Sequence, residues 1–114
     1  MIGADWQAAV PVLEHWRACH GDRLALMVDA NQALDRTQAL QAVRTRREFG
    51  LLWLEEPLAA DAPADDWCAV ADAAGDELPL AAGENLRGAA AFERAIESGA
   101  VRVLQPDVIK WGGF

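Results

Sequence analysis

Short apolar runs alternate with longer amphipathic stretches along the whole chain. Runs that are apolar on both faces are typical of parallel strands covered by helices. We expect four such strands, at Leu24–Asp29, Leu51–Glu55, Leu78–Ala82 and Val101–Gln105. A helical stretch that ends in glycine precedes each run, and glycine closes a helix well because it adopts the left-handed conformation without steric cost. These glycines are Gly21, Gly50, Gly75 and Gly99.

Helix signals fill the stretches between the strands. Asp35 can cap the helix that follows the first strand, with Gln38 three residues later as its capping-box partner. The next helix has Asp61 and Pro63 at its start, where proline is well tolerated. The apolar face of that helix comprises Trp67, Val70, Ala71 and Ala74.

The outer two helical stretches carry weaker patterns. The last complete one has a single apolar stripe made of Phe92, Ala95 and Ile96. The first, over about residues 5–20, is interrupted by Pro11. Because proline removes a backbone donor and clashes with the preceding turn, the helix either begins at Pro11 or kinks there.

This alternation of helices and strands predicts an α/β fold with parallel strands and right-handed crossovers. Four consecutive helix–strand units of this kind form part of a (β/α)8 TIM-type barrel, which has eight strands and roughly 250 residues when complete. The chain of 114 residues therefore holds about half of such a barrel.

Composition narrows the class of protein. A hydrophobic content of 53% is ample for a packed core. The net charge of −8 argues against a nucleic-acid or membrane partner, both of which need clustered Lys and Arg. No run reaches the roughly 18 apolar residues that span a bilayer, and residues 1–3 resemble no secretory leader. Cys19 and Cys68 suggest free thiols in a reducing compartment, so we expect a soluble cytoplasmic protein.

An acidic residue stands at or just after the end of each apolar run. The spacing between successive acids is about 23 to 29 residues, the length of one strand–loop–helix unit. In a parallel barrel the carboxyl ends of all strands share one face, so these side chains would converge, and they would repel one another unless a cation lay between them. The first three supply the hard oxygen ligands that suit Mg²⁺. In order, the four acids are Asp29, Glu55, Glu84 and Asp107.

The pattern leaves alternatives open for the first three acids. Each could instead be a loop residue that caps the following helix. Glu55 competes with Glu56 for the role of ligand, because periodicity alone does not say which of the two faces the barrel axis. Asn31 and Asn85, which follow candidate ligands closely, could bind substrate or orient ligands, or could be ordinary turn residues.

Asp107 has two interpretations as well. It could form a structural salt bridge with Lys110, three residues further on. Alternatively, it could orient a catalytic histidine and raise the basicity of that ring. His15 and His20 are poor candidates for that histidine, because both fall in or near the first helix, away from the barrel mouth.

Four ordered motifs surround the acids. They read VDANQ at residues 28–32, WLEEP at 53–57, GEN at 83–85 and QPDVIKWGG at 105–113. This set resembles the enolase superfamily, most closely its mandelate racemase and acid-sugar dehydratase branch, and the resemblance covers nearly the whole chain. It implies a modified (β/α)8 barrel in which Asp29, Glu55 and Glu84 hold Mg²⁺, with Glu55 rather than Glu56 as the ligand.

The same resemblance implies a reaction. Family members abstract the proton α to a substrate carboxylate and form an enediolate bound to Mg²⁺. The small-molecule substrate would be a hydroxy acid such as an aldonate or aldarate, and the enzyme a dehydratase or a racemase. Asp107 matches the Asp that pairs with a seventh-strand His in this branch, which argues against the branches that carry a Lys there. Asn31, Asn85 and Lys110 are then candidates for binding substrate or orienting ligands.

The chain also departs from the family pattern. Ile2-Gly3 is similar to the end of a Lys-x-Lys motif, but Met1 stands at the position of the second Lys. The seventh-strand His, the remaining strands and the capping domain have no counterpart. We therefore expect residues 1–114 to be the central fragment of an enolase-type barrel domain, inactive by itself and prone to self-association or homo-oligomer formation. The alternative is a non-catalytic remnant that binds a metal or a partner.

Overall fold

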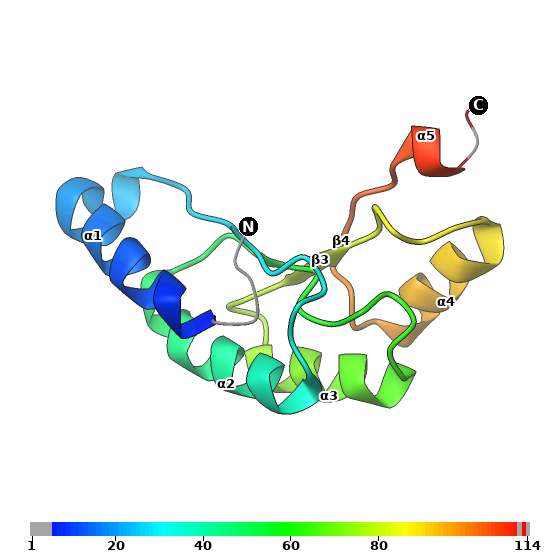
Figure 1. Cartoon of the computed structure of the whole chain (residues 1–114), viewed down its shortest axis with the longest axis horizontal. Coiled ribbons are helices and arrows are strands. Elements are labelled where there is room, and N and C mark those ends of the chain that lie inside the picture. Colours follow the sequence, from blue (N-terminus) through cyan, green and yellow to red (C-terminus); the bar gives the residue numbers. More distant parts are fainter. Residues whose placement is uncertain (1–5, 112, 114) are drawn as a thin grey trace.

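The computed structural model, which describes residues 6–111 and 113, has its helices arranged in an arc around a small parallel sheet (Figure 1). The four strands pair in the order β1-β2-β3-β4, and every neighbouring pair is parallel. The predicted α/β fold of four helix–strand units is confirmed. The strands are β1 (Val28–Asp29), β2 (Leu54–Glu55), β3 (Leu80–Ala82) and β4 (Val103–Leu104).

The helices of the arc follow one another in chain order, and a short helix α5 comes after β4 (Figure 1). Within the described ranges, none of them is long and apolar enough to cross a membrane. The α-helices are α1 (Val10–His20), α2 (Arg36–Arg46), α3 (Ala64–Ala74), α4 (Ala89–Ser98) and α5 (Val108–Trp111). Three 3-10 turns are η1 (Trp6–Ala9), η2 (Gly21–Arg23) and η3 (Arg47–Phe49).

Each strand is shorter than its apolar run. Backbone pairing does continue upstream of β1 and β2, since the amide of Leu52 donates to the carbonyl oxygen of Leu26 at 2.8 Å. In the run that contains β3, Pro79 has no N–H and only accepts, from Leu54 at 3.0 Å. The apolar runs therefore predict the positions of the strands, whereas the strands themselves cover only two or three residues of each run.

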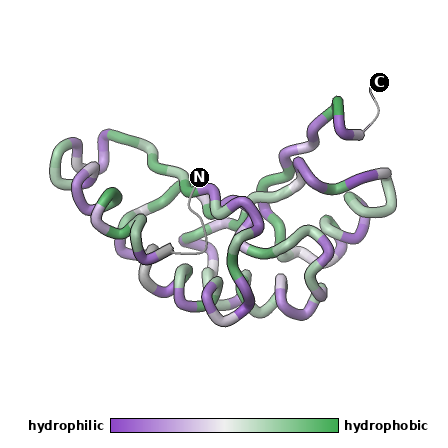
Figure 2. The backbone as a smooth tube through the Cα atoms, in the orientation of Figure 1, coloured by the Kyte–Doolittle hydropathy of each residue, from purple (hydrophilic) through white to green (hydrophobic). Residues whose placement is uncertain are grey.

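The core lies between the sheet and the helices. Val28, Leu54 and Leu80 are register partners on three adjacent strands, and all three are buried. Hydrophobic residues follow the strand segments in the middle of the molecule, while hydrophilic residues recur along the outer helices (Figure 2). Helices α2 and α3 complete this core with buried Ala39, Ala42, Val43, Trp67, Val70 and Ala74.

The predicted helix boundaries agree with the structure. The amide of Gln38 donates to Asp35 Oδ1 at 2.8 Å, and the amide of Asp35 donates to Gln38 Oε1 at 2.9 Å, which is a complete capping box. Helix α1 begins at Val10 with Pro11 in its first turn, directly after the 3-10 turn η1, so the α-helix starts next to the proline. Gly99 ends α4 in the left-handed conformation, at φ 66°. Gly21 and Gly75, which follow α1 and α3, also have positive φ, but their ψ values of −144° and −166° lie outside the left-handed helical region.

The predicted stripe on α4 is less buried than its pattern suggests. Ile96 is 60% exposed, and no residue of α4 is fully buried. Phe92 instead contacts the ring of Trp111 from α5, with centroids 5.6 Å apart. The physical reason is position, because α4 lies near one end of the arc, where among the described elements only the short helix α5 lies beyond it (Figure 1).

The Arg17 guanidinium joins the end of α1 to the segment before β2. It donates to four backbone carbonyl oxygens, at distances between 2.7 and 2.9 Å. These acceptors are Gly21, Leu24, Phe49 and Gly50. Charge-assisted bonds of this kind fix α1 against the chain that leads into the first two strands.

Candidate metal centre

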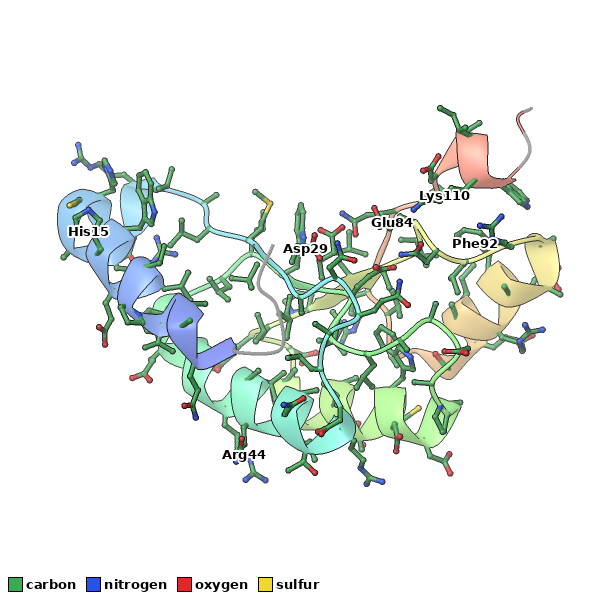
Figure 3. The ribbon with its side chains drawn as sticks, in the orientation of Figure 1. His15, Asp29, Arg44, Glu84, Phe92 and Lys110 are labelled. Carbon is green, nitrogen blue, oxygen red and sulfur yellow. The ribbon has the colours of Figure 1, made fainter. Side chains whose placement is uncertain are left out.

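The carboxyl ends of the strands bring the predicted acids to one edge of the sheet. The register pairs Asp29 directly with Glu55, so their backbones are neighbours on adjacent parallel strands. Glu84 follows the end of β3 and Asp107 follows the end of β4. In Figure 3, Asp29 and Glu84 lie at this same edge, on the side away from α2 and α3.

Asp29 shapes the loop that follows β1. Its Oδ1 accepts a hydrogen bond from the amide of Asn31 at 2.7 Å, and Asn31 and Gln32 both have positive φ, at 48° and 61°. A carboxylate that accepts from the residue two positions on forms an Asx turn, which also stabilises the left-handed backbone that follows. Asp29 therefore has one oxygen committed to the loop.

Glu55 and Glu56 have opposite environments. Glu55 is the register partner of Asp29 on β1 and of Ala81 on β3. It is partly exposed and accepts a hydrogen bond from Trp53 Nε1 at 3.2 Å. Glu56 is only 2% exposed, and its backbone has φ 39°, an uncommon value for a residue other than glycine. Burial therefore distinguishes Glu55 from Glu56, which periodicity could not do.

The Glu56 carboxyl is buried but not isolated. Burial raises its pKa above the usual value, the hydrogen bond from Asn85 opposes that rise, and the negative charges of Glu84 and Asp29 add to it. The Gln32 side chain supplies a further opposing hydrogen bond. The negative charges of Glu84 and Asp29, from two other loops, therefore act on the Glu56 carboxyl in addition to burial.

Asn85 connects these loops. Its Nδ2 donates to both oxygens of Glu56, at 3.0 and 2.8 Å, and lies 3.1 Å from Glu84 Oε1. Its Oδ1 accepts from Lys110 Nζ at 3.2 Å. The ammonium of Lys110 also forms an ion pair with Glu84, at 3.6 Å. Asn85 therefore links the ends of β2 and β3 to helix α5.

The interpretation of Asp107 as a salt-bridge partner of Lys110 is wrong. Asp107 Oδ1 accepts from the backbone amides of Ile109 at 2.9 Å and Lys110 at 3.2 Å, which caps the short helix α5. The ammonium of Lys110 instead contacts Glu84 and Asn85, which follow β3. The other oxygen of Asp107 accepts no hydrogen bond from the described residues.

The two histidines lie far from this edge, as predicted. Both are exposed on α1, at the opposite end of the arc from α5 (Figure 3). The residues around Met1 that bear on the Lys-x-Lys comparison lie outside the described residues.

Two residues that sequence reasoning did not single out hold the edge together. The side-chain Oε1 of Gln32 accepts a hydrogen bond from the backbone amide of Ala60 at 2.8 Å. The backbone amide of Gln32 donates to the backbone carbonyl oxygen of Glu56 at 2.8 Å. At Gly83 a Cβ atom would lie 2.8 Å from the backbone nitrogen of Gln105, so only glycine lets β3 and β4 approach this closely. Both residues lie in the motifs quoted above, but no periodic pattern identifies them.

The donor chemistry at this edge fits a hard divalent cation, because three carboxylates come from consecutive strand ends. Their side chains are turned toward protein partners: Asp29 to Asn31, Glu55 to Trp53, and Glu84 to Asn85 and Lys110. Among the described residues, no three His, Cys, Asp or Glu side chains stand close enough together to hold one ion. The backbone positions thus suit a metal, and ligation would require the side chains to reorient.

A parallel (β/α)-barrel unit with carboxylates at the strand ends defines the class of protein. Residues 1–114 match the family described as Enolase C-terminal domain-like, and the chain belongs to this family. Its curated relatives are acid-sugar dehydratases and cycloisomerases, and its structural relatives are mandelate racemase-like members of the enolase superfamily.

Three of these relatives illustrate the similarity. The L-talarate/galactarate dehydratase of Salmonella typhimurium is 41% identical over 98 residues, which are 86% of this chain and 24% of that protein. A mandelate racemase/muconate lactonizing enzyme from Bordetella bronchiseptica RB50 has a solved structure with a TM-score of 0.91 and 46% identity, over 99% of this chain and 31% of that one. The L-talarate dehydratase of Polaromonas sp. JS666, solved with Mg and L-glucarate, has a TM-score of 0.86 and 36% identity, over 96% of this chain and 30% of that one.

The chain spans less than a third of the length of each of these proteins. The shared part comprises the strands, the strand-end loops and the helices described above. The assignment of the fold and of the family rests on similarity over nearly all of this chain.

Proposed function

We propose that residues 1–114 form the metal-binding section of a Mg²⁺-dependent enzyme that acts on a small hydroxy acid. The reaction would begin with removal of the proton α to the substrate carboxylate, as in an acid-sugar dehydratase or racemase. The observation that carries this proposal is the register that pairs Asp29 with Glu55, together with Glu84 at the end of the next strand.

Asp29, Glu55 and Glu84 are the proposed ligands. The choice of Glu55 over Glu56 rests on their environments. Glu55 is the register partner of Asp29 and is partly exposed, whereas Glu56 is buried and accepts hydrogen bonds from Asn85. When bound, Mg²⁺ supplies positive charge where negative charge develops on the substrate carboxylate. The donors that now hold the three carboxylates would be exchanged for the ion.

The neighbouring polar residues have supporting roles in this proposal. Lys110 forms an ion pair with the proposed ligand Glu84, and its ammonium can also interact with an anionic substrate. Asn85 holds Glu84 against the buried Glu56, which limits the positions that the Glu84 carboxylate can take. Asn31 is exposed beside Asp29, with its side-chain amide available to a substrate oxygen.

Asp107 is proposed as a positioning residue for a histidine. Its Oδ1 is occupied by the cap of α5, which fixes the carboxylate and leaves Oδ2 for an imidazole N–H. No histidine of the described residues reaches it, because His15 and His20 both belong to α1. The base that removes the α-proton would come from outside the described residues.

Calorimetric titration of the chain with Mg²⁺ tests the ligand set. We expect binding to the unchanged chain, and a loss of affinity of about tenfold or more in Asp29→Asn, Glu55→Gln and Glu84→Gln. Glu93→Gln, which neutralises an exposed acid on α4, is the matched control and should bind as the unchanged chain does. Absence of Mg²⁺ binding, or a greater loss in Glu56→Gln than in Glu55→Gln, would contradict the proposed ligands.

A further inference from the structure

A second group of potential metal ligands lies on the outer surface of α1. His15 and Cys19 are one helical turn apart, and both side chains are exposed. The imidazole Nε2 of His15 lies 3.7 Å from the thiol sulfur of Cys19. Residues four positions apart on a helix face the same way, so this contact follows from the helical backbone of α1.

The separation of these two atoms matches a chelate. Zinc bonds to thiolate sulfur at about 2.3 Å and to imidazole nitrogen at about 2.0–2.1 Å, and its preferred angle is tetrahedral. Those values place the sulfur and the nitrogen of one zinc ion about 3.6 Å apart. The 3.7 Å found here would therefore need almost no adjustment to bind such an ion.

The neighbouring rings restrict the His15 side chain. Trp16 meets the ring of His15 edge-on, with centroids 6.4 Å apart, and stacks on the ring of His20 at 5.2 Å. His20 is therefore held against Trp16 and does not join the pair. This arrangement leaves one imidazole and one sulfur facing solvent together.

We propose that His15 and Cys19 form a two-donor surface site for a thiophilic divalent cation of the Zn²⁺ type. Binding would form one Zn–S and one Zn–N bond, the thiol proton would pass to solvent, and water would fill the remaining coordination positions. Thiolate and imidazole select such a cation over Mg²⁺, which prefers oxygen ligands. The site is distinct from the strand-end carboxylates, because α1 and those carboxylates lie in different parts of the molecule (Figure 3).

Thiol reactivity tests this site on the 114-residue chain. Cys68→Ala leaves Cys19 as the sole thiol, because the chain contains two cysteines. In this background we expect Zn²⁺ to slow the reaction of Cys19 with a thiol reagent by about tenfold or more, and Mg²⁺ at the same concentration to have no effect. Binding of Co²⁺ in place of Zn²⁺ should add a sulfur-to-metal charge-transfer band, which Cys19→Ser should abolish.

Two histidine variants give the deciding comparison. His15→Ala should lose most of the protection by Zn²⁺, whereas His20→Ala, the matched control on the same helix, should keep it. Both side chains are exposed, so helix content measured by circular dichroism should be the same in each variant. Equal protection in His15→Ala and the parent, equal loss in the two histidine variants, or no protection in the parent would overturn the proposal.

Discussion

The side-chain amide of Asn85 donates to both carboxylate oxygens of Glu56, at 3.0 and 2.8 Å. This contact joins residues that belong to successive strand-end loops, and it satisfies a carboxyl group that is almost completely buried. Since Asn85 also contacts Glu84 and Lys110, the network spans the edge at which the proposed ligands lie.

Replacement of Asn85 should therefore destabilise the fold. Asn85→Ala would leave the buried Glu56 carboxyl without its main donor, and an unsatisfied buried polar group costs about 1–3 kcal/mol. Urea denaturation in the presence of a chelator measures the change in the free energy of unfolding. The exposed substitution Glu93→Ala should change it by less than about 0.5 kcal/mol. Equal stability of the two variants would show that the Asn85–Glu56 contact contributes nothing.

The pKa of Glu56 predicts a dependence of stability on pH. Because that pKa is raised in the folded chain, the folded state favours the protonated carboxyl. The contribution of Glu56 is therefore fully present below its unfolded pKa and is lost as the pH rises through the folded pKa. Chemical denaturation without metal at a series of pH values should show this loss, and Glu56→Gln should lack it. An identical pH profile in both proteins would contradict the prediction.

The proposed ligands should not be needed for folding without metal. Carboxylates gathered at one edge repel one another, so Asp29→Asn and Glu84→Gln should leave the melting temperature in a chelator unchanged or slightly higher. Asn at position 29 can still accept from the amide of Asn31. A large drop in melting temperature would instead indicate that these acids serve the loops as structural caps.

The 114-residue chain should bind Mg²⁺ but not turn over an acid sugar. The described residues offer no histidine at the strand-end edge, and a missing general base costs roughly 10²–10⁴-fold in rate. An assay for dehydration or racemisation of aldonates and aldarates, with and without Mg²⁺, measures this. Mg²⁺-dependent product formation would show that the chain supplies its own base. Binding without turnover is also the behaviour of a non-catalytic metal-binding remnant.

The chain studied alone should self-associate. In the described sheet, β1 and β4 each pair on one side only, and unpaired strand edges recruit other strands. Met27 and Leu52, in the runs that lead into β1 and β2, are 49% and 50% exposed. Sedimentation over a range of concentrations should show oligomers or aggregates. A monodisperse monomer with a cooperative thermal transition would contradict this prediction.

The sequence by itself predicted the order of the four strands and of helices α1 to α4, but not the short helix α5 or the three 3-10 turns. The four apolar runs predicted the four strands, the Asp35–Gln38 pair predicted the start of α2, and Gly99 predicted the end of α4. These features depend on residues that are close together along the chain, so their physics is local and can be read from spacing. The strand-end acids were found in the same way, because each directly ends or follows an apolar run.

Only the tertiary structure decided which groups contact one another. It buried Glu56 and left Glu55 accessible, directed Lys110 to Glu84 instead of Asp107, and left Ile96 exposed. Each outcome depends on neighbours from other strands or helices, and a periodic pattern describes one element at a time. The position of a side chain at the edge of a parallel sheet is set by the next strand, which here lies a whole helix away along the chain.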